Sequence, residues 1–302
     1  MLTNTPLESY LLAQTSTALE CVICNAENCA SAERCRRCHA PLSLTRQSAS
    51  LRRRPHLIAV LGGPGAGKTV YLGMLLDMLT RGVGGLRAHA RGPQSITLQQ
   101  STTTALASGW FPDRTPNVPD QWHWVHCRVE CGRRRRTMEL MLADVAGEAW
   151  TQVDVDSTQQ IAVPAILSRA DGVLLLADAE RLHGGEPDES YGMLKALSLL
   201  TELRREPGRR GRRPDRRPCA VVFTKADACG RALDDPEGFA ESHAATLLGD
   251  CRSRLPNTKV FATSVVGAST RRVAAGNRRA TPLRVEPQGV VEPLGWLLNQ
   301  VE

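Results

Sequence analysis

The sequence contains very little lysine. Only four of its 38 basic residues are lysines, and arginine supplies the rest of a net charge of +7. A bias this strong can reflect codon composition as much as function, so the positive charge by itself does not indicate nucleic-acid binding. Two of the four lysines, Lys68 and Lys225, fall instead inside short motifs that contain glycine or aspartate.

Long apolar stretches are also missing. No run approaches the roughly 18 apolar residues of a membrane-spanning helix, and the first residues lack the basic and apolar segments of a secretory signal. With ten cysteines and no such signal, we expect a cytoplasmic protein whose thiols bind metal or are buried. The 42% hydrophobic content over 302 residues predicts one large domain with a substantial core and a small appendage.

A glycine-rich segment, Gly62 to Thr69, lies between a predicted strand and a predicted helix. Its spacing, G-x-x-x-x-G-K-[ST], lets backbone N–H groups surround a β-phosphate, because only small residues permit so close an approach. We expect Lys68 to neutralise β- and γ-phosphate oxygens and the Thr69 hydroxyl to hold Mg²⁺. The predicted nucleotide contacts of this loop are Gly62, Gly65, Ala66, Gly67, Lys68, Thr69 and Val70.

A predicted β-hairpin leads to a second motif. Its strands are Trp122–Glu130 and Thr137–Ala143, and the second strand runs into Asp144-Val145-Ala146-Gly147-Glu148. An aspartate at the end of a strand beside a phosphate loop reaches Mg²⁺, and the glycine three residues later can donate its N–H to the γ-phosphate. We therefore assign Asp144 with Thr69 to magnesium, and Lys68, Gly147 and Glu148 to catalysis.

The rest of the chain alternates between predicted helices and apolar strands, which is typical of a mostly parallel sheet with helices on both faces. The predicted elements are helices Ile161–Ser168 and Ser190–Arg205, and strands Gly172–Ala177, Cys219–Phe223 and Lys259–Ala262. Residues 267–288, rich in arginine, glycine and proline, predict a surface loop before a closing helix that begins near Val291.

Two of these strands end in candidate base contacts. Thr224-Lys225-Ala226-Asp227 follows one strand, and the Asp227 carboxylate can accept two hydrogen bonds from guanine that adenine cannot supply. Thr263-Ser264-Val265 follows another strand, where backbone contacts to the guanine carbonyl are expected. Together these motifs favour GTP over ATP.

Two C-x-x-C knuckles stand near the amino terminus. Cys21, Cys24, Cys35 and Cys38 have the spacing that places four thiolates around one tetrahedral ion, and zinc is the expected metal. With Asn28, the spacing resembles the Ran-binding-protein type of zinc finger, although Leu19 stands where that family usually has tryptophan, so we expect a structural knuckle. The motif C-x-x-C-H at Cys35–His39 also matches a c-type haem attachment site, but that chemistry requires export and the sequence shows no export signal.

These features predict four segments: an arm over 1–20, a zinc knuckle module over 21–40, a linker over 41–55 and a phosphate-loop domain over 56–302. The long segment 86–121, with a helical patch at Ile96–Ala107, lies where a switch loop is expected. It contains the candidates for a further threonine ligand of Mg²⁺, which are Thr102, Thr103, Thr104 and Thr115.

The order of these motifs over 56–302 resembles the translation-factor and Ras-like class of P-loop GTPases. The zinc knuckles, the D-x-A-G-E motif and the late W-L-L helix resemble, more narrowly, the bacterial double-GTPase family. The resemblance implies a second GTPase as partner. Three residues depart from the Ras-like pattern: Pro64 stands where glycine is common, Glu148 replaces the glutamine that orients water, and Thr224 replaces asparagine.

The residues leave two functional hypotheses. The first is a GTP-hydrolysing switch that needs GTP or GDP, Mg²⁺ and zinc, has a slow intrinsic rate and works with a partner protein. The second is a binding module in which the zinc knuckle and the eight arginines between Arg204 and Arg217 hold nucleic acid or an acidic partner. We favour the first, because a run of arginines is usually a solvated surface and this run lacks interleaved aromatic residues.

Overall fold

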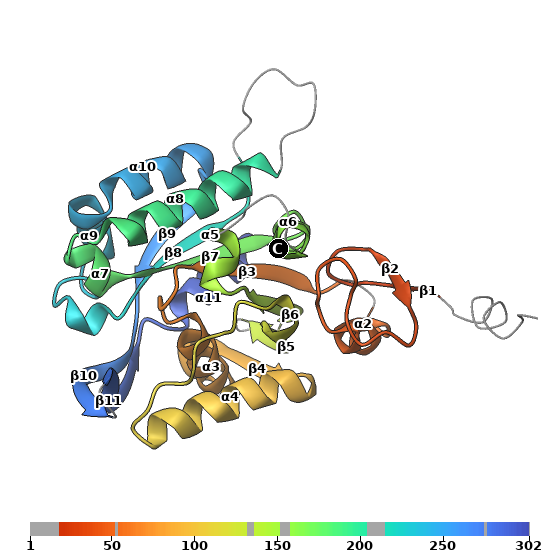
Figure 1. The fold of residues 1–302 in the computed structure, drawn as a ribbon, viewed down its shortest axis with the longest axis horizontal. Helices are drawn as coiled ribbons and strands as arrows, with labels where there is room; N and C mark the ends of the chain where they lie inside the picture. Colours follow the sequence, from red (N-terminus) through yellow and green to blue (C-terminus); the bar gives the residue numbers. More distant parts are fainter. Residues whose placement is uncertain are drawn as a thin grey trace, which may run out of the picture.

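The computed structural model describes residues 18–51, 54–131, 136–151, 158–203, 215–274 and 277–301. Figure 1 shows a central sheet with helices on both faces and a small amino-terminal module at one side. The sheet strands are β3 (His56–Gly62), β4 (Leu86–Ala90), β5 (His123–Cys131), β6 (Arg136–Asp144), β7 (Gly172–Asp178), β8 (Cys219–Thr224) and β9 (Thr258–Ala262). The helices are α2 (Leu42–Ser48), α3 (Lys68–Thr80), α4 (Gly92–Ala107), α5 (Gly147–Thr151), α6 (Thr158–Leu167), α7 (Ala179–His183), α8 (Pro187–Glu202), α9 (Pro236–His243), α10 (Ala245–Arg254) and α11 (Glu292–Gln300), with 3₁₀ turns η1 (Val83–Gly85), η2 (Pro119–Gln121) and η3 (Ala226–Ala228).

The sheet has seven strands in the order β4-β5-β6-β3-β7-β8-β9. Strands β6, β3, β7, β8 and β9 run parallel to one another, and β5 is antiparallel to both β4 and β6. The predicted α/β class with a mostly parallel sheet is therefore confirmed. None of the described helices is long and apolar enough to cross a membrane.

Alternate residues of β3 face two separate cores. Leu57 and Leu61 pack with helices α6, α8, α9 and α10, whereas Ile58 and Val60 pack with α3 and α11. Because successive strand side chains point to opposite faces, an uninterrupted apolar run such as Leu57–Leu61 requires helices on both sides. This doubly covered sheet holds the carboxyl ends of its parallel strands at one edge.

The amino-terminal module comprises β1 (Ala18–Glu20), β2 (Glu27–Cys29), the two cysteine knuckles and α2. Helix α2 lies within the stretch expected as a linker, and its Leu42 and Leu44 are buried in the same core as Trp122 and Trp124 of the large domain. The module is thus packed against the side of the large domain (Figure 1).

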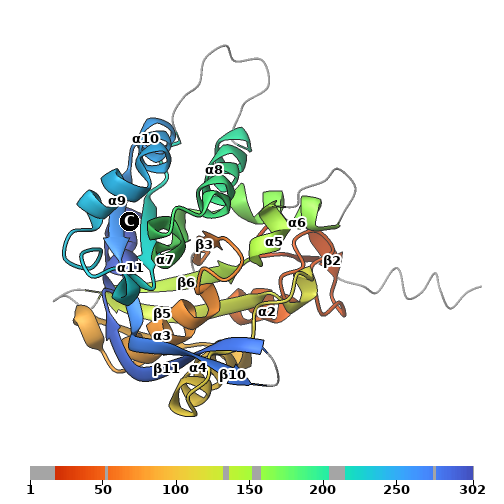
Figure 2. The same ribbon diagram turned by 60° about the vertical axis from the view of Figure 1, so that its left-hand side comes forward.

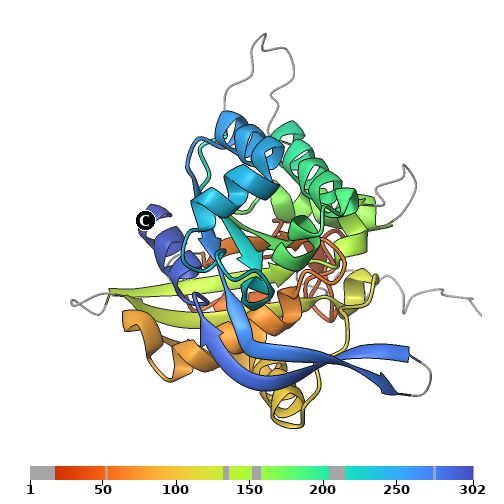
Figure 3. The same cartoon turned by 90° about the vertical axis from the view of Figure 1, so that its left-hand side faces the viewer.

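Residues 267–288 do not form the predicted surface loop. They belong to a long antiparallel hairpin of β10 (Ser264–Ala274) and β11 (Asn277–Gln288), which pair only with each other among the described strands. Figure 2 and Figure 3 show this hairpin extending past α3 and α4. Arginine, glycine and proline are poor predictors of a strand, but a free two-stranded ribbon does not need an apolar face.

The segment 86–121 is also more ordered than a switch loop. It contains β4, which the sequence analysis missed, and α4, which extends the predicted helical patch at Ile96–Ala107 toward the amino terminus. The irregular part between α4 and η2 is only residues 108–118. Of the turn between the two predicted hairpin strands, residues 132–135 lie outside the described residues, and Arg136 already belongs to β6.

Candidate functional site

The phosphate loop connects the end of β3 to the start of α3. Gly67 is the residue before the helix and has a φ of 78°, a left-handed conformation that glycine adopts at little cost. The Lys68 ammonium points back across the loop and donates to the carbonyl oxygens of Gly62, at 2.8 Å, and Gly63, at 3.2 Å. Burial lowers the pKa of Lys68. The loop therefore holds a buried cation at a helix amino terminus, which suits an anion.

Three side chains meet beside the loop. The Thr69 hydroxyl donates to the Asp144 carboxylate at 3.0 Å, the Thr115 hydroxyl donates to the same oxygen at 3.1 Å, and the two hydroxyl oxygens lie 2.7 Å apart. The other carboxylate oxygen of Asp144 is buried and has no hydrogen-bond partner among the described residues. Two hydroxyls and a carboxylate form an all-oxygen ligand set of the kind that Mg²⁺ takes.

The structure distinguishes among the four candidate threonines. Thr115 lies at the oxygen cluster, whereas Thr102, Thr103 and Thr104 lie on α4. Thr102 is buried against Gly73, and the Thr103 hydroxyl donates to the Gln99 carbonyl within its own helix at 2.9 Å. Only Thr115 of these four is placed to join Thr69 and Asp144.

Gly147 packs directly against the phosphate loop. A Cβ on Gly147 would lie 2.5 Å from the backbone nitrogen of Pro64 and 2.6 Å from the carbonyl carbon of Gly63, so no other residue fits this position unchanged. Glu148 follows at the start of α5 and lines the same cavity as the loop. Both predicted residues therefore stand at the phosphate end of the site.

The base-recognition candidates converge from two strands. At the end of β8, Thr224 donates its hydroxyl to the Ala66 carbonyl of the phosphate loop at 2.8 Å, and the next residue, Lys225, forms an ion pair with Asp178. After β9, the Ser264 hydroxyl donates to the Asp227 carboxylate at 2.6 Å. The residues that would hold the base are thus tied both to one another and to the phosphate loop.

One cavity of about 730 Å³ connects these groups, a size typical of small-molecule sites. Predicted site residues that line it are Gly65, Gly67, Lys68, Thr69, Val70, Gly147, Glu148, Thr224, Lys225, Asp227, Thr263 and Val265. Four predicted residues do not line it: Gly62, Ala66, Asp144 and Ser264. Gly62 and Ala66 contribute carbonyl oxygens to Lys68 and Thr224, Asp144 supports Thr69, and Ser264 supports Asp227.

One wall of the cavity consists of residues that were not predicted from the sequence. Phe111, Pro112, Asp113 and Arg114 line it from the loop after α4, and Glu180 lines it from α7. The β10–β11 hairpin completes this wall with Val266 to Thr270 of β10 and Ala280 of β11. One sequence signal could have placed the hairpin at the cavity, because it begins at Ser264, inside the predicted base-contact motif. Its arginine, glycine and proline content predicted a loop instead.

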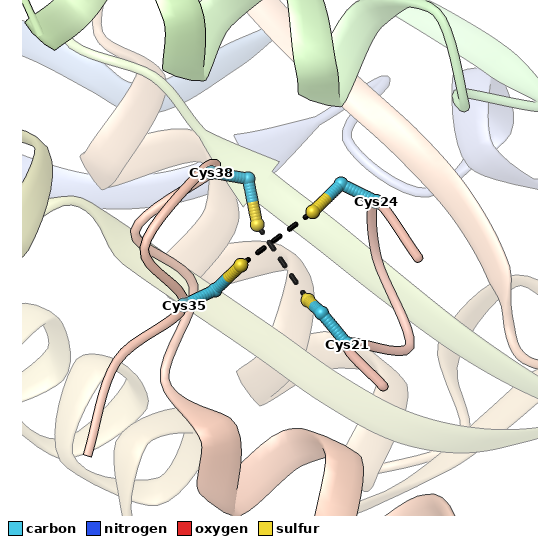
Figure 4. Close-up of side chains that lie close together, drawn as sticks. All are labelled: Cys21, Cys24, Cys35 and Cys38. Carbon is cyan, nitrogen blue, oxygen red and sulfur yellow. Dashed lines mark hydrogen bonds between the residues drawn. The ribbon is translucent and has the colours of Figure 1, made fainter. Parts of the chain in front are cut away.

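The four knuckle cysteines form a second site, in the amino-terminal module (Figure 4). All four are buried, and their sulfur atoms lie within 4.8 Å of one another, with pairs at 3.5 and 3.6 Å. A tetrahedral zinc ion with Zn–S bonds of about 2.3 Å requires sulfur separations of about 3.8 Å, so the residues fit zinc. Within the cluster, the interaction that lowers the pKa of the Cys24 thiol raises the pKa of Cys21.

Asn28 joins the two knuckles. Its amide nitrogen donates to the Ala26 carbonyl at 2.7 Å, and its amide oxygen accepts from the Arg36 backbone N–H at 2.9 Å. The asparagine identified from the spacing therefore fixes the first knuckle relative to the second.

Comparison with known proteins decides the family. A family model described as Double-GTPase 2 matches residues 56–284, which is more than two thirds of the chain. The chain belongs to the Double-GTPase 2 family. The resemblance to P-loop GTPases of the double-GTPase kind is thereby confirmed, and the match begins at the first residue of β3.

No curated protein matches this Double-GTPase 2 chain. Among solved structures it is similar to a Plasmodium falciparum protein described as nucleolar GTP-binding protein 1. The identity is 11%, the match covers 71% of this chain and 78% of that one, and the TM-score is 0.36. A score this low carries no weight for fold or function, and the assignment rests on the family match.

Proposed function

We propose that this Double-GTPase 2 protein binds GTP with Mg²⁺ and hydrolyses it to GDP and phosphate as a molecular switch. The observation that carries the proposal is the single cavity that Lys68, Thr69, Gly147 and Asp227 share. These residues come from three separate connections at the carboxyl ends of β3, β6 and β8, and each would contact a different part of a guanine nucleotide. Family membership supports the same activity.

The phosphate end would work by position and charge. Lys68 would turn from the carbonyls of Gly62 and Gly63 toward the β- and γ-phosphates, and the Gly147 N–H would donate to the γ-phosphate. Thr69, Thr115 and Asp144 would hold Mg²⁺, which would supply positive charge beside the transferring phosphoryl group. Glu148 would orient the attacking water, a weaker arrangement than the glutamine of Ras-like enzymes and consistent with slow hydrolysis.

The switch would follow from the loss of the γ-phosphate. The loop of residues 108–118 is held at Thr115 by the oxygen cluster, and α5 is held at Gly147 by its contact with the phosphate loop. With GTP bound, Mg²⁺ at the oxygen cluster and the γ-phosphate at the Gly147 N–H would add a further attachment to both segments, and departure of the γ-phosphate would remove that attachment from both together.

We include a protein partner in this proposal, and the family description, Double-GTPase 2, supports a second GTPase as that partner. All ten cysteines are free thiols, which is compatible with the reducing conditions of the cytoplasm.

The alternative hypothesis of a binding module relied on eight arginines between Arg204 and Arg217. One of them, Arg217, is buried and donates to the carbonyls of Leu167, at 2.5 Å, and Leu200, at 3.3 Å, so it does not face a partner. The run from Arg204 to Arg213 lies outside the described residues.

The test is a nucleotide-specificity switch. Asp227→Asn should lower GTP affinity at least about tenfold, because the asparagine amide places an N–H donor opposite the amine donor of guanine. It should improve binding of xanthosine triphosphate, because xanthine has a carbonyl oxygen acceptor at that position. Lys68→Ala should abolish phosphate release. Asp234→Asn, which changes an exposed aspartate that is not among the residues lining the cavity, serves as the control and should behave as wild type. Unchanged base preference in Asp227→Asn, or salt-dependent retention on nucleic acid without turnover, would contradict the proposal.

A further inference from the structure

The loop between α4 and η2 brings an arginine to the phosphate end of the cavity. Residues Phe111 to Thr115 all line the cavity, and the Thr115 hydroxyl lies 2.7 Å from that of Thr69. This contact fixes the position of the loop at the predicted magnesium ligands. Arg114 precedes Thr115 in the chain, so the contact between Thr115 and Thr69 also places the Arg114 backbone near the phosphate loop.

The guanidinium of Arg114 reaches the phosphate loop itself. Its Nη2 atom lies 3.8 Å from the position that a Cβ on Gly65 would occupy. Gly65 is the fourth residue of the phosphate loop and has no side chain, so nothing of its own separates Arg114 from a bound phosphate. The guanidinium therefore lies beside the part of the loop whose backbone would surround the β- and γ-phosphates, where it would just touch a side chain on Gly65.

Arg114 is not neutralised by a neighbour. Within the part of the chain that the structure describes, it makes no ion pair and no hydrogen bond, although it lines a cavity that also contains carboxylates. Lys225, in the same cavity, is already paired with Asp178. An arginine that is exposed, unpaired and placed at an anion site is free to bind that anion.

A second arginine shows the contrast. Arg181 also contacts the phosphate loop, with its Nη1 atom 3.4 Å from the Pro64 carbonyl oxygen. That guanidinium is held by two carboxylates, Glu186 at 2.7 Å and buried Glu189 at 3.0 Å. Arg181 therefore supports the loop from outside, whereas Arg114 can move onto the nucleotide.

We propose that Arg114 is a catalytic residue that the chain supplies to its own active site. The inference rests on the proposed function and adds to it a source of positive charge that a Ras-like GTPase usually takes from a partner. During hydrolysis the water oxygen bonds to the γ-phosphorus, the bond to the β–γ bridging oxygen breaks, and its electron pair stays on GDP. Both water protons end on inorganic phosphate, H₂PO₄⁻. Arg114 stabilises the negative charge that builds on the bridging and γ-phosphate oxygens.

The proposal changes the role expected of a partner. With its own arginine, the protein does not need a partner to insert one past Pro64. A partner would instead act by ordering the loop of residues 108–118, or by binding that loop only when GTP is present. The protein alone should therefore form the transition-state complex.

The experiment compares wild type with Arg114→Ala and Arg114→Lys, using the full chain loaded with GDP, Mg²⁺ and aluminium fluoride. Wild type alone should bind aluminium fluoride, and Arg114→Ala should not. In single-turnover assays, Arg114→Ala should hydrolyse GTP at least roughly 100-fold more slowly, since such arginines contribute about 10³- to 10⁵-fold. Its affinity for a non-hydrolysable GTP analogue should stay within about threefold of wild type. Arg114→Lys should recover only part of the rate, because lysine lacks the planar fork.

The control is Arg81→Ala, an exposed arginine just after the far end of α3, which should match wild type in every assay. A hydrolysis rate within threefold of wild type in Arg114→Ala would overturn the inference. So would an equal loss of rate and analogue affinity, or failure of the wild-type protein alone to bind aluminium fluoride. Failure of wild type to bind GTP at all would instead count against the proposed function.

Discussion

The carboxylate of Asp120 lies 2.9 Å from the Nδ1 atom of His39, the residue that follows Cys38 of the zinc knuckle. Asp120 is in η2, at the end of the loop that carries Arg114 and Thr115. A second contact joins the module to the large domain, because Arg169 donates to the side chain of Asn25 at 3.1 Å. The zinc module therefore holds the base of the loop that reaches the nucleotide site, although the two sites belong to different parts of the sequence.

We expect Asp120→Ala to loosen this loop without unfolding the protein. The pair is half exposed, so its loss should cost no more than about 1 kcal/mol of stability. Amide hydrogen exchange of residues 109–118 should become faster, and GTP affinity should fall about two- to fivefold. Glu237→Ala removes an exposed ion pair with Arg252 on α9 and α10 and provides the matched control. Unaltered exchange in the loop would show that the module does not restrain it.

Removing one knuckle thiol should remove the metal. Cys35 is buried in the cluster, so we expect elemental analysis to find one zinc per chain in wild type and none in Cys35→Ser. Because the module packs on Trp122 and Trp124, its release should also shift tryptophan emission to longer wavelength. Cys29→Ser changes the exposed thiol nearby and should keep both zinc and emission. Full zinc content in Cys35→Ser would refute the four-cysteine site.

Thr115→Ala should weaken the response to magnesium. It removes one of the two hydroxyls at Asp144, so the Mg²⁺ concentration for half-maximal hydrolysis should rise about tenfold. Thr103→Ala is the comparison, because that hydroxyl bonds only to carbonyls of its own helix. A titration of phosphate release against Mg²⁺ distinguishes the two, and equal curves for both variants would mean that Thr115 is an ordinary loop residue.

Gly147→Ala should damage the site through sterics alone. The added Cβ would meet the phosphate-loop backbone at 2.5 Å, so the loop or α5 must shift, and we expect at least a tenfold loss of GTP affinity with about 1–3 kcal/mol of destabilisation. Gly249→Ala places the same methyl group in open space on α10 and should stabilise the protein by about 0.5–1 kcal/mol. Calorimetric titration with GTP and urea unfolding measure the two effects. Wild-type affinity in Gly147→Ala would show that this close contact is not needed.

The motifs at the ends of buried strands were predictable because their information is local. A short apolar run followed by G-x-x-x-x-G-K-T, by Asp144 or by Thr224-Lys225-Ala226-Asp227 fixes both the strand and the position of its polar residues. Parallel packing of such strands then brings the motifs to one edge of the sheet. For the same reason the zinc cysteines, which are close in sequence, were identified correctly as a cluster.

Features that depend on distant contacts could not be predicted. The choice of Thr115 over Thr103 depends on where the loop of residues 108–118 meets Thr69, and no local pattern records that. Arg217 looked like part of a solvated run, yet it is buried because Leu167 and Leu200 from other elements present carbonyls to it. The β10–β11 hairpin pairs with itself and so lacks the apolar alternation that marks a half-buried strand.

The β10–β11 hairpin has a mechanical consequence. Its first residue, Ser264, donates a hydrogen bond to Asp227, while the rest of the ribbon extends away from the sheet (Figure 3). Further along the same ribbon, Val266 to Thr270 and Ala280 line the cavity, and Val266 packs in one cluster with Met74 of α3 and Leu106 of α4. A contact that displaced the far end of the ribbon would therefore disturb one wall of the nucleotide cavity as well as the serine that positions Asp227.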